Sequence, residues 1–392
     1  MKEKINDWEK NHSHRITKYW MAVIIIISTS ILMALVGLFP RACDWYTDHI
    51  YGGLSDAISR VTAVFPFALG EIIMYMAILL VLLAIIFLIL LIFLGKKEAY
   101  LKFCKSYYKT ILIILFCFIW IYMPLWFVPF CGTTLGKGSQ DLRTEFSNEE
   151  LYILIDYVVE EGNKAAEEIE IDEDGMVHFP DADVQEKLIE DAMLAISDDY
   201  PRLKGYYPPV KEALCSDILN RMDIGGYNYP YTMEPTHNKY MNPIYSSLLD
   251  AHELCHHHGY YKENEANFLS QLALIESPDP YLRMAACINT YFYLIDDYKA
   301  VSDVNFDEGN GESGTQAPEF SERLWYIYNL GYDVADQVYE ADAHPLDKIP
   351  EADEAIKEIS DKGWEVQGDI LEENSYDGVV LLLLQYYDGK LY

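Results

Sequence analysis

Basic residues are scarce in the C-terminal two thirds of this 392-residue sequence. Residues 131–392 contain 17 Lys and Arg against 54 Asp and Glu, a net charge of −37, whereas residues 1–130 carry a net charge of +4. So acidic a domain is excluded from binding nucleic acid through its phosphates, because that requires a basic face. It would also be repelled by an anionic membrane surface. We interpret the acidity as keeping a secreted domain soluble, in preference to serving a specific cationic partner.

Cysteine is sparse as well. The seven cysteines form no CxxC pair, which argues against a cysteine zinc site. An odd, scattered set is also not a disulfide framework. Cys43 and Cys131 each follow an apolar run and could meet on one face of a membrane, where we expect two free thiols rather than a bridge.

Long apolar runs are confined to the first 130 residues. Each of three runs is long enough to cross about 30 Å of hydrocarbon. No small-x-small cleavage site follows the first run, so we interpret it as an anchor and not as a cleaved signal peptide. The sequence therefore predicts a membrane anchor over residues 1–133, with transmembrane helices at about 20–39, 72–95 and 110–130.

The basic residues around these runs predict their orientation. Five Lys and Arg precede the first run, two lie in the loop 40–71, and five lie in the loop 96–109. Because short cytoplasmic segments are the ones enriched in Lys and Arg, the N-terminus is expected inside the cell. A domain spanning residues 134–392 would then lie outside the cytoplasm.

The patterning of that domain is mainly helical. Ser147-Asn-Glu-Glu150 is a capping box that opens a helix to about residue 169. The Tyr-rich stretch 225–233 predicts a strand or turn, with a small sheet near 225–240. Residues 304–318, rich in Gly, Asp, Glu and Ser, are typical of a loop. Further helices are expected over about 183–197, 210–222, 246–258, 263–275 and 280–300.

A metal-binding motif lies in this domain. His252-Glu253-Leu254-Cys255-His256 is HExxH, and positions i and i+4 of a helix share one face, so both imidazoles can reach one zinc ion. Glu253 can hold a metal-bound water and accept its proton during attack on a carbonyl. The alternative is a solvated helix end, in which His256, His257 and His258 favour the negative end of the helix dipole.

A catalytic zinc site needs a third protein ligand and one open position. Gly259 suits a helix end that reverses the chain, after which Glu263-Asn-Glu265-Ala-Asn267 opens the next helix. We expect Glu263 to be the third ligand, with Glu265 as the second choice. Asn267 shares the face of Glu263 and could orient a ligand.

At these residues the chain resembles a family of bacterial membrane proteins catalogued as domain of unknown function 3810, which are zincin-like. The resemblance runs nearly end to end. Its most specific part is the HExxHxxGxxxExEANF core from His252 to Phe268, and it departs from the family's usual Trp-Gly-Asn-Tyr-Tyr run at Cys131-Gly-Thr-Thr-Leu-Gly. The resemblance extends over the three spans, Phe65–Glu71, Tyr227–Glu234 and Ser375–Leu383. It implies three transmembrane helices followed by a zincin-like α(+β) metallopeptidase domain, in a bacterial cell membrane.

These observations predict a membrane-anchored, zinc-dependent metallopeptidase that hydrolyses peptide bonds of an extracytoplasmic protein or peptide. Glu253 would be the catalytic residue, and Tyr376 could donate a hydrogen bond to the developing oxyanion. Glu234 and His237 could line the cleft, and Tyr227–Tyr231 could be an edge strand that pairs with a peptide. The alternative is a non-catalytic binding module with a structural or vestigial zinc site. Transport is disfavoured, because no paired charges lie inside the apolar runs.

Overall fold

The computed structural model of the chain describes residues 2–136, 142–301, 317–371 and 375–392. Side chains are described for these residues except 2–17, 300–301, 350, 361, 363–371 and 375–377. The fold is mainly helical with a small sheet, as the sequence predicts. It divides into two compact units, which are treated separately below.

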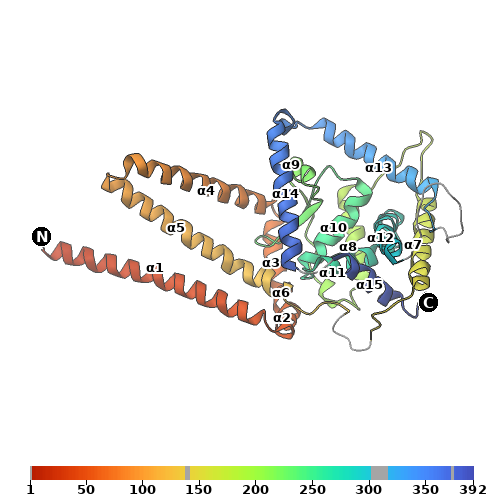
Figure 1. The fold of residues 1–392 in the computed structure, drawn as a ribbon, viewed down its shortest axis with the longest axis horizontal. Helices are drawn as coiled ribbons and strands as arrows, with labels where there is room; N and C mark the ends of the chain where they lie inside the picture. The colour runs from red at the N-terminus through yellow and green to blue at the C-terminus, as the bar shows by residue number, and fades with distance from the viewer. Residues whose placement is uncertain (1, 137–141, 302–316, 372–374) are drawn as a thin grey trace. The chain divides into compact units, whose positions relative to one another are not determined.

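The first unit consists of residues 1–53, 69–133 and 230–232. Its long helices are α1 (Lys2–Val36), α4 (Leu69–Leu94) and α5 (Glu98–Tyr122), and α5 packs against both of the others (Figure 1). Shorter pieces are α2 (Pro40–Tyr46), the π-turns Thr47–Tyr51 and Met123–Phe127, and α6 (Val128–Phe130). Three stretches of this unit are long and apolar enough to cross a membrane, in agreement with the predicted number of spans: Lys18–Val36, Leu69–Leu94 and Glu98–Phe130.

The third of these stretches begins earlier than predicted, at Glu98, well before the apolar run starts. Its end at Phe130 agrees with the prediction. The π-turn Met123–Phe127 accommodates Pro124, which has no N–H to donate. Tyrosine hydroxyls fasten α5 to α4 through main-chain carbonyls, with Tyr107 donating to Leu80 O at 2.7 Å and Tyr108 to Ala84 O at 2.6 Å.

The second unit consists of residues 54–68, 134–229 and 233–392, so its division from the first unit is not a single cut in the chain. Its N-terminal segment carries most of α3 (Gly52–Thr62). Its other helices are α7 (Asn148–Glu168), α8 (Ala182–Ala195), α9 (Ser216–Arg221), α10 (Pro243–His257), α11 (Glu263–Ile275), α12 (Pro280–Val301), α13 (Glu322–Ala341), α14 (Pro350–Leu371) and α15 (Ser375–Tyr387). Short 3₁₀ turns occur at Pro201–Leu203 and Pro345–Lys348.

Most of the predicted helices of this unit are confirmed. The capping box closes as expected: Glu150 N donates to Ser147 Oγ at 3.2 Å, and Ser147 N donates to the Glu150 carboxylate at 2.8 Å. The helix predicted over 210–222 is wrong in its first half. That stretch contains strand β1 (Lys211–Glu212), and only Ser216–Arg221 is helical. Most of the predicted loop 304–318 lies outside the described residues.

The sheet has the strand order β1-β3-β2. Strand β3 (Glu234–His237) is central, parallel to β1 and antiparallel to β2 (Gly226–Tyr229). Lys211 is in register with Thr236, and Gly226 with His237. Within the described part of the chain, β2 is an edge strand of this sheet. The small sheet predicted near 225–240 is confirmed, and β1 is an addition to it.

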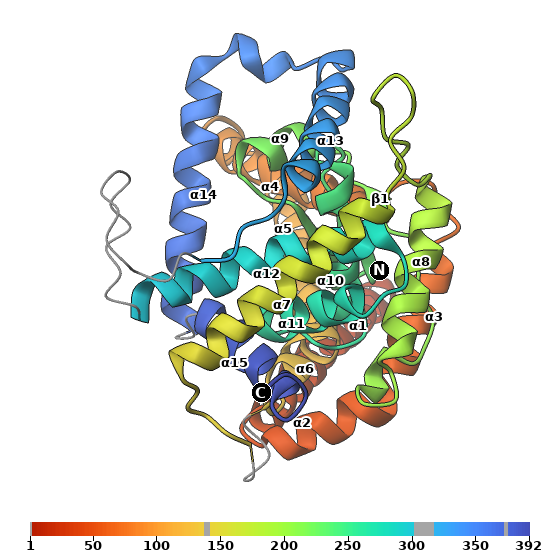
Figure 2. The same ribbon diagram turned by 90° about the vertical axis from the view of Figure 1, so that its right-hand side faces the viewer.

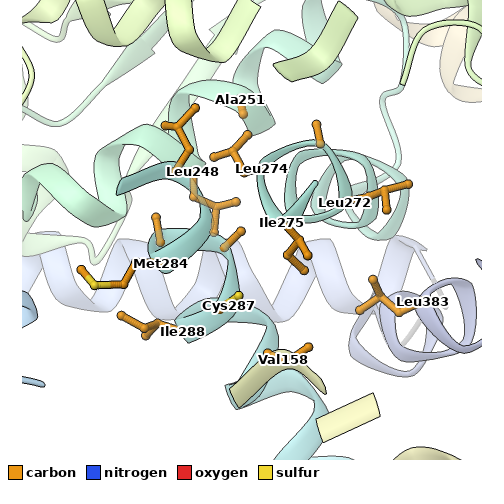
Figure 3. Close-up of a cluster of buried hydrophobic side chains, with 14 of the residues drawn as sticks. Val158, Leu248, Ala251, Leu272, Leu274, Ile275, Met284, Cys287, Ile288 and Leu383 are labelled. Carbon is orange, nitrogen blue, oxygen red and sulfur yellow. The ribbon is translucent and has the colours of Figure 1, made fainter. Parts of the chain in front are cut away.

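The core of the second unit lies between helices α7, α10, α11, α12 and α15 (Figures 2 and 3). Helix α7 packs closely on α12 because Gly162 has no side chain: a Cβ there would lie 3.1 Å from Cys287 Cβ. The labelled side chains in Figure 3 come from all five helices and include Val158, Leu248, Leu272, Cys287 and Leu383. This packing fixes α10 and α11, the two helices that carry the metal motif.

Candidate metal site

Local sequence determines how α10 and α11 begin and end. Asn242 caps α10, accepting a hydrogen bond from Ile244 N at 2.9 Å, and Pro243 occupies the first turn, where no N–H is needed. The helix ends at His257, and Gly259 then takes a φ of 89°, a left-handed conformation that glycine adopts without strain. The chain reverses there and starts α11 at Glu263.

This reversal brings three potential ligands together. One ligand atom from each of His252, His256 and Glu263 lies within 4.8 Å of the other two. The Glu263 carboxylate is 3.1 Å from His252 Nε2 and 3.6 Å from His256 Nε2. The two imidazole rings stand nearly perpendicular, with centroids 4.6 Å apart. The predicted first-choice set therefore converges on one point.

His256 is held in one tautomer. Its Nδ1–H donates to Tyr260 O at 2.8 Å, so in the neutral ring the lone pair is on Nε2, the atom nearer Glu263. Burial lowers the pKa of His256, but the Glu263 carboxylate more than offsets this and raises it to about 9. In return, the pKa of Glu263 lies well below its usual value, because the two imidazoles outweigh the effect of burial. The negative charge of Glu263 therefore lies directly against the two imidazoles.

Glu253 stands beside the cluster without belonging to it. Its side chain is buried, and within the described part of the chain Oε2 has no hydrogen-bond partner. Burial raises the pKa of this carboxyl to about 7, although His256 and His252 oppose the shift. Strand β2 lies directly against Glu253: a Cβ on Gly226 would be 3.4 Å from Glu253 Oε1 and only 2.3 Å from Thr236 O. Glycine is therefore required where the edge strand approaches this carboxylate.

Glu265, the second-choice ligand, points elsewhere. It is buried and accepts a hydrogen bond from Leu135 N at 2.8 Å, which fastens the segment after residue 133 to α11. The carbonyl of Asn267 accepts from Ser270 Oγ at 3.1 Å, and its side chain makes no hydrogen bond to the described residues. The side chain of Tyr376 lies outside the described residues.

His237 and Glu234 are both engaged in the sheet. His237 Nδ1 bonds to Asp250 Oδ1 at 2.7 Å, and Gln185 donates to the other oxygen of Asp250 at 3.0 Å. Sequence reasoning did not find the partners Asp250 and Gln185, although an aspartate two positions before His252 on a largely apolar helix was a usable signal. Glu234 forms a buried ion pair with Lys211 of β1.

The solvated-helix-end interpretation of His257 and His258 is wrong. Both side chains are buried. Burial lowers the pKa of His257 well below its usual value, and lowers that of His258 to about 4. Both rings are therefore neutral near pH 7 and gain nothing from the helix dipole. Instead, Ser55 Oγ donates to the main-chain carbonyl of His257 at 3.0 Å, and His258 packs on the Tyr207 ring at 4.4 Å.

Comparison with known proteins gives one match. A family model described as "Protein of unknown function (DUF3810)" matches residues 46–312. The matched region includes α4, α5, the sheet and both helices that carry the ligand cluster. No curated protein and no solved structure shows significant similarity to the chain. Since the model covers well over half of the sequence, the chain belongs to the DUF3810 family.

Proposed function

We propose that this protein is a membrane-anchored, zinc-dependent metallopeptidase whose second unit is zincin-like. The proposal depends on the arrangement of four side chains. His252, His256 and Glu263 converge on one point. Beside them stands Glu253, a buried carboxylate whose Oε2 has no hydrogen-bond partner in the described part of the chain. A helix bearing both histidines packs beside a sheet whose edge strand borders Glu253.

The donor set fits zinc. Two imidazole nitrogens and one carboxylate are a common catalytic zinc set, and three protein ligands leave a coordination position open. The hydrogen bond from His256 Nδ1 to Tyr260 O is the kind of outer contact that orients a metal-binding imidazole. Softer metals are disfavoured by the lack of sulfur, since Cys255 lies between the two histidines in sequence but is fully buried in the core.

When bound, zinc would supply Lewis acidity, lowering the pKa of a coordinated water to about 7 and polarising a substrate carbonyl. Glu253 would accept the proton of that water on its unpaired Oε2 and deliver it to the leaving amine. Burial of Glu253 supports this role, because it disfavours a permanently charged carboxylate and strengthens the carboxyl as a base. Asp250 and Gln185 would hold the sheet against α10 through His237.

The substrate would be a protein or peptide outside the cytoplasm. The distribution of basic residues around the three apolar helices supports an extracytoplasmic second unit. The position of β2 at the edge of the sheet is compatible with a peptide substrate, because an extended chain can add to a sheet edge through main-chain hydrogen bonds.

A non-catalytic binding module with a structural zinc ion is the second candidate. A binding module would use the same three zinc ligands and the same acidic domain as the enzyme. It gives no role to Glu253, which is buried at a cost and whose Oε2 has no hydrogen-bond partner among the described residues. For that reason we favour the enzyme.

The substitution Glu253→Gln distinguishes the two. The amide keeps the shape of the side chain but cannot act as a base, so the full-length protein should keep its zinc. Turnover of a peptide found by proteomic cleavage screening should fall by roughly 100-fold or more. Zinc content by mass spectrometry and initial cleavage rates are the measurements. Equal rates for wild type and Glu253→Gln at equal zinc content would contradict the mechanism. Zinc binding with no cleavage by either protein would favour the binding module.

A further inference from the structure

Helix α3 and the residues after it bury polar side chains and expose apolar ones, the reverse of an ordinary surface helix. This segment, Leu54–Ala68, lies between the first two apolar helices in sequence, yet it packs with the second unit. The helix buries Ser55, Ser59 and Thr62, which recur at i, i+4 and i+7 and therefore form one stripe. An ordinary surface helix buries its apolar stripe and exposes the polar one. Here the polar stripe faces the protein.

The buried polar stripe is held by specific contacts. Ser55 Oγ donates to His257 O at 3.0 Å, and Asp56 accepts from Tyr206 N at 3.3 Å. The guanidinium of Arg60 lies over the Tyr206 ring at 4.0 Å. Both charged side chains of the segment thus contact the protein, with Asp56 half-buried and Arg60 still exposed to solvent.

A buried lysine fixes the turn after α3. Lys211 Nζ donates to Thr62 O at 2.9 Å and to Phe67 O at 3.1 Å, and it is paired with Glu234 on the central strand. These bonds close the loop between the two carbonyls. These hydrogen bonds hold the loop in one conformation, in which its apolar side chains are exposed.

The outward face of the segment is apolar. Its large exposed side chains are Leu54, Val61, Val64, Phe65 and Phe67, with Val64 78 % exposed and Val61 65 % exposed. Exposed apolar residues scattered singly need no explanation, but a continuous group of them rimmed by polar residues marks an interaction surface. Exposing these apolar side chains to water is unfavourable.

The position of this segment in the chain, directly before an apolar helix, indicates what covers its apolar face. Phe67 is two residues before α4, a 26-residue apolar helix that begins at Leu69. A helix with one polar and one strongly apolar face, next to a membrane span, has the properties of an interfacial helix that lies in the plane of the bilayer surface. The acidity of the domain does not oppose this, because the acid of the segment, Asp56, is turned toward the protein.

We propose that α3 and the loop Ala63–Phe67 form a membrane-surface helix, whose apolar face lies at the boundary between lipid headgroups and acyl chains while its polar face holds the second unit. This inference does not depend on peptidase activity. It has a consequence for the metal site, because Ser55 binds the main chain of His257, the residue after the ligand His256. The end of the metal-binding helix would be fastened to a helix that lies on the bilayer.

Site-specific photocrosslinking tests the proposal. The photoreactive residue benzoylphenylalanine replaces Val61 or Val64 in the full-length protein, reconstituted in nanodiscs of phosphatidylcholine and phosphatidylglycerol. The matched control is Val184 in α8, an exposed valine of the same unit, and the positive control is Ile85 in α4. Zinc content and monodisperse elution check that each variant is folded.

Covalent lipid adducts, detected by mass spectrometry, are expected from positions 61, 64 and 85 and not from position 184. Adducts from Ile85 alone would overturn the proposal, because the α3 face would then be in water. Crosslinks from positions 61 and 64 to a second copy of the chain, without lipid adducts, would also overturn it and identify a protein partner instead. Equal yields at positions 64 and 184 would show non-specific lipid contact and count against it.

Discussion

Glu263 and Glu265 are two residues apart on one helix but face different surroundings. Glu263 lies between the two histidines, whereas Glu265 accepts a hydrogen bond from Leu135 N. The i+4 relation of His252 and His256 places both imidazoles on one side of α10, and the turn at Gly259 determines which glutamate returns to that side. The position of the turn, more than the identity of the side chain, therefore decides which glutamate joins the two histidines.

We predict that Glu263→Gln loses zinc and that its matched control, Glu265→Gln, keeps it. A neutral amide is a poor zinc ligand at the first position. At the second position the amide oxygen can still accept the bond from Leu135 N. Metal analysis of the two purified full-length variants is the measurement. Loss of zinc from Glu265→Gln with retention in Glu263→Gln would exchange their roles.

His252 and His256 should be equally necessary for metal binding. In His252→Ala the remaining imidazole and carboxylate offer two ligands, one fewer than the three protein ligands of a catalytic zinc site. We expect the zinc content to fall to background. His257→Ala is a poor control, since His257 is buried. Full zinc stoichiometry in His252→Ala would refute the ligand assignment.

At the scale of elements, strand β2 lies very close to β3 and α10 at Gly226. A Cβ on Gly226 would meet Thr236 O at 2.3 Å, a distance that real Cβ atoms do not adopt. We therefore expect Gly226→Ala to displace the edge strand and to lower the free energy of unfolding by about 1–3 kcal/mol. Gly53→Ala is the matched control, because nothing lies within 4 Å of a Cβ there. The measurement is the melting temperature of each variant in thermal unfolding, and equal melting temperatures would contradict the prediction.

The sequence predicts those elements whose signals are local. Ser147 and Glu150 specify the start of α7, and the HExxH spacing places both histidines on one helical face. Strand β1 has only two residues and is defined by its pairing with Thr236, far along the chain, so no local pattern indicates it. The periodicity of α3 marks an amphipathic helix, but periodicity does not tell which face meets protein. That information comes from tertiary contacts such as Ser55 with His257.

At the scale of the whole molecule, the orientation in the membrane would decide which proteins the proposed peptidase could reach. The five, two, five distribution of Lys and Arg predicts that residues 131–392 lie outside the cytoplasm. An alkaline phosphatase fused to the C-terminus should be active, since that enzyme matures only outside the cytoplasm, and a fusion at Lys102 should not. The reverse pattern of activities would place the metal site in the cytoplasm.

The two units also divide the chain differently from a single boundary near residue 133. Leu54–Ala68 precedes two of the apolar helices but packs with the second unit, where Lys211 depends on the carbonyls of Thr62 and Phe67. A fragment of residues 134–392 would leave that lysine with Glu234 alone and would expose the surface covered by Ser55. Breaking such a buried polar network is costly, because each unpaired group loses its hydrogen bonds without regaining full hydration.

We therefore predict that the fragment 134–392 is markedly less heat-stable than the same fragment linked at its N-terminus, through a flexible Gly/Ser linker, to residues 54–68. The matched control is the linked form with Ser55→Leu and Ser59→Leu, which keeps the length and the helix but cannot present the polar stripe. The native linked segment should raise the melting temperature more than the Leu-substituted one, because the substitutions remove the bond to His257 and the fit of the polar stripe, while the groups that bond Tyr206 and Lys211 remain. If all three proteins unfold at one temperature, the segment contributes nothing to the stability of the second unit. If the Leu-substituted form is stabilised equally, apolar burial and not the polar stripe holds α3 in place.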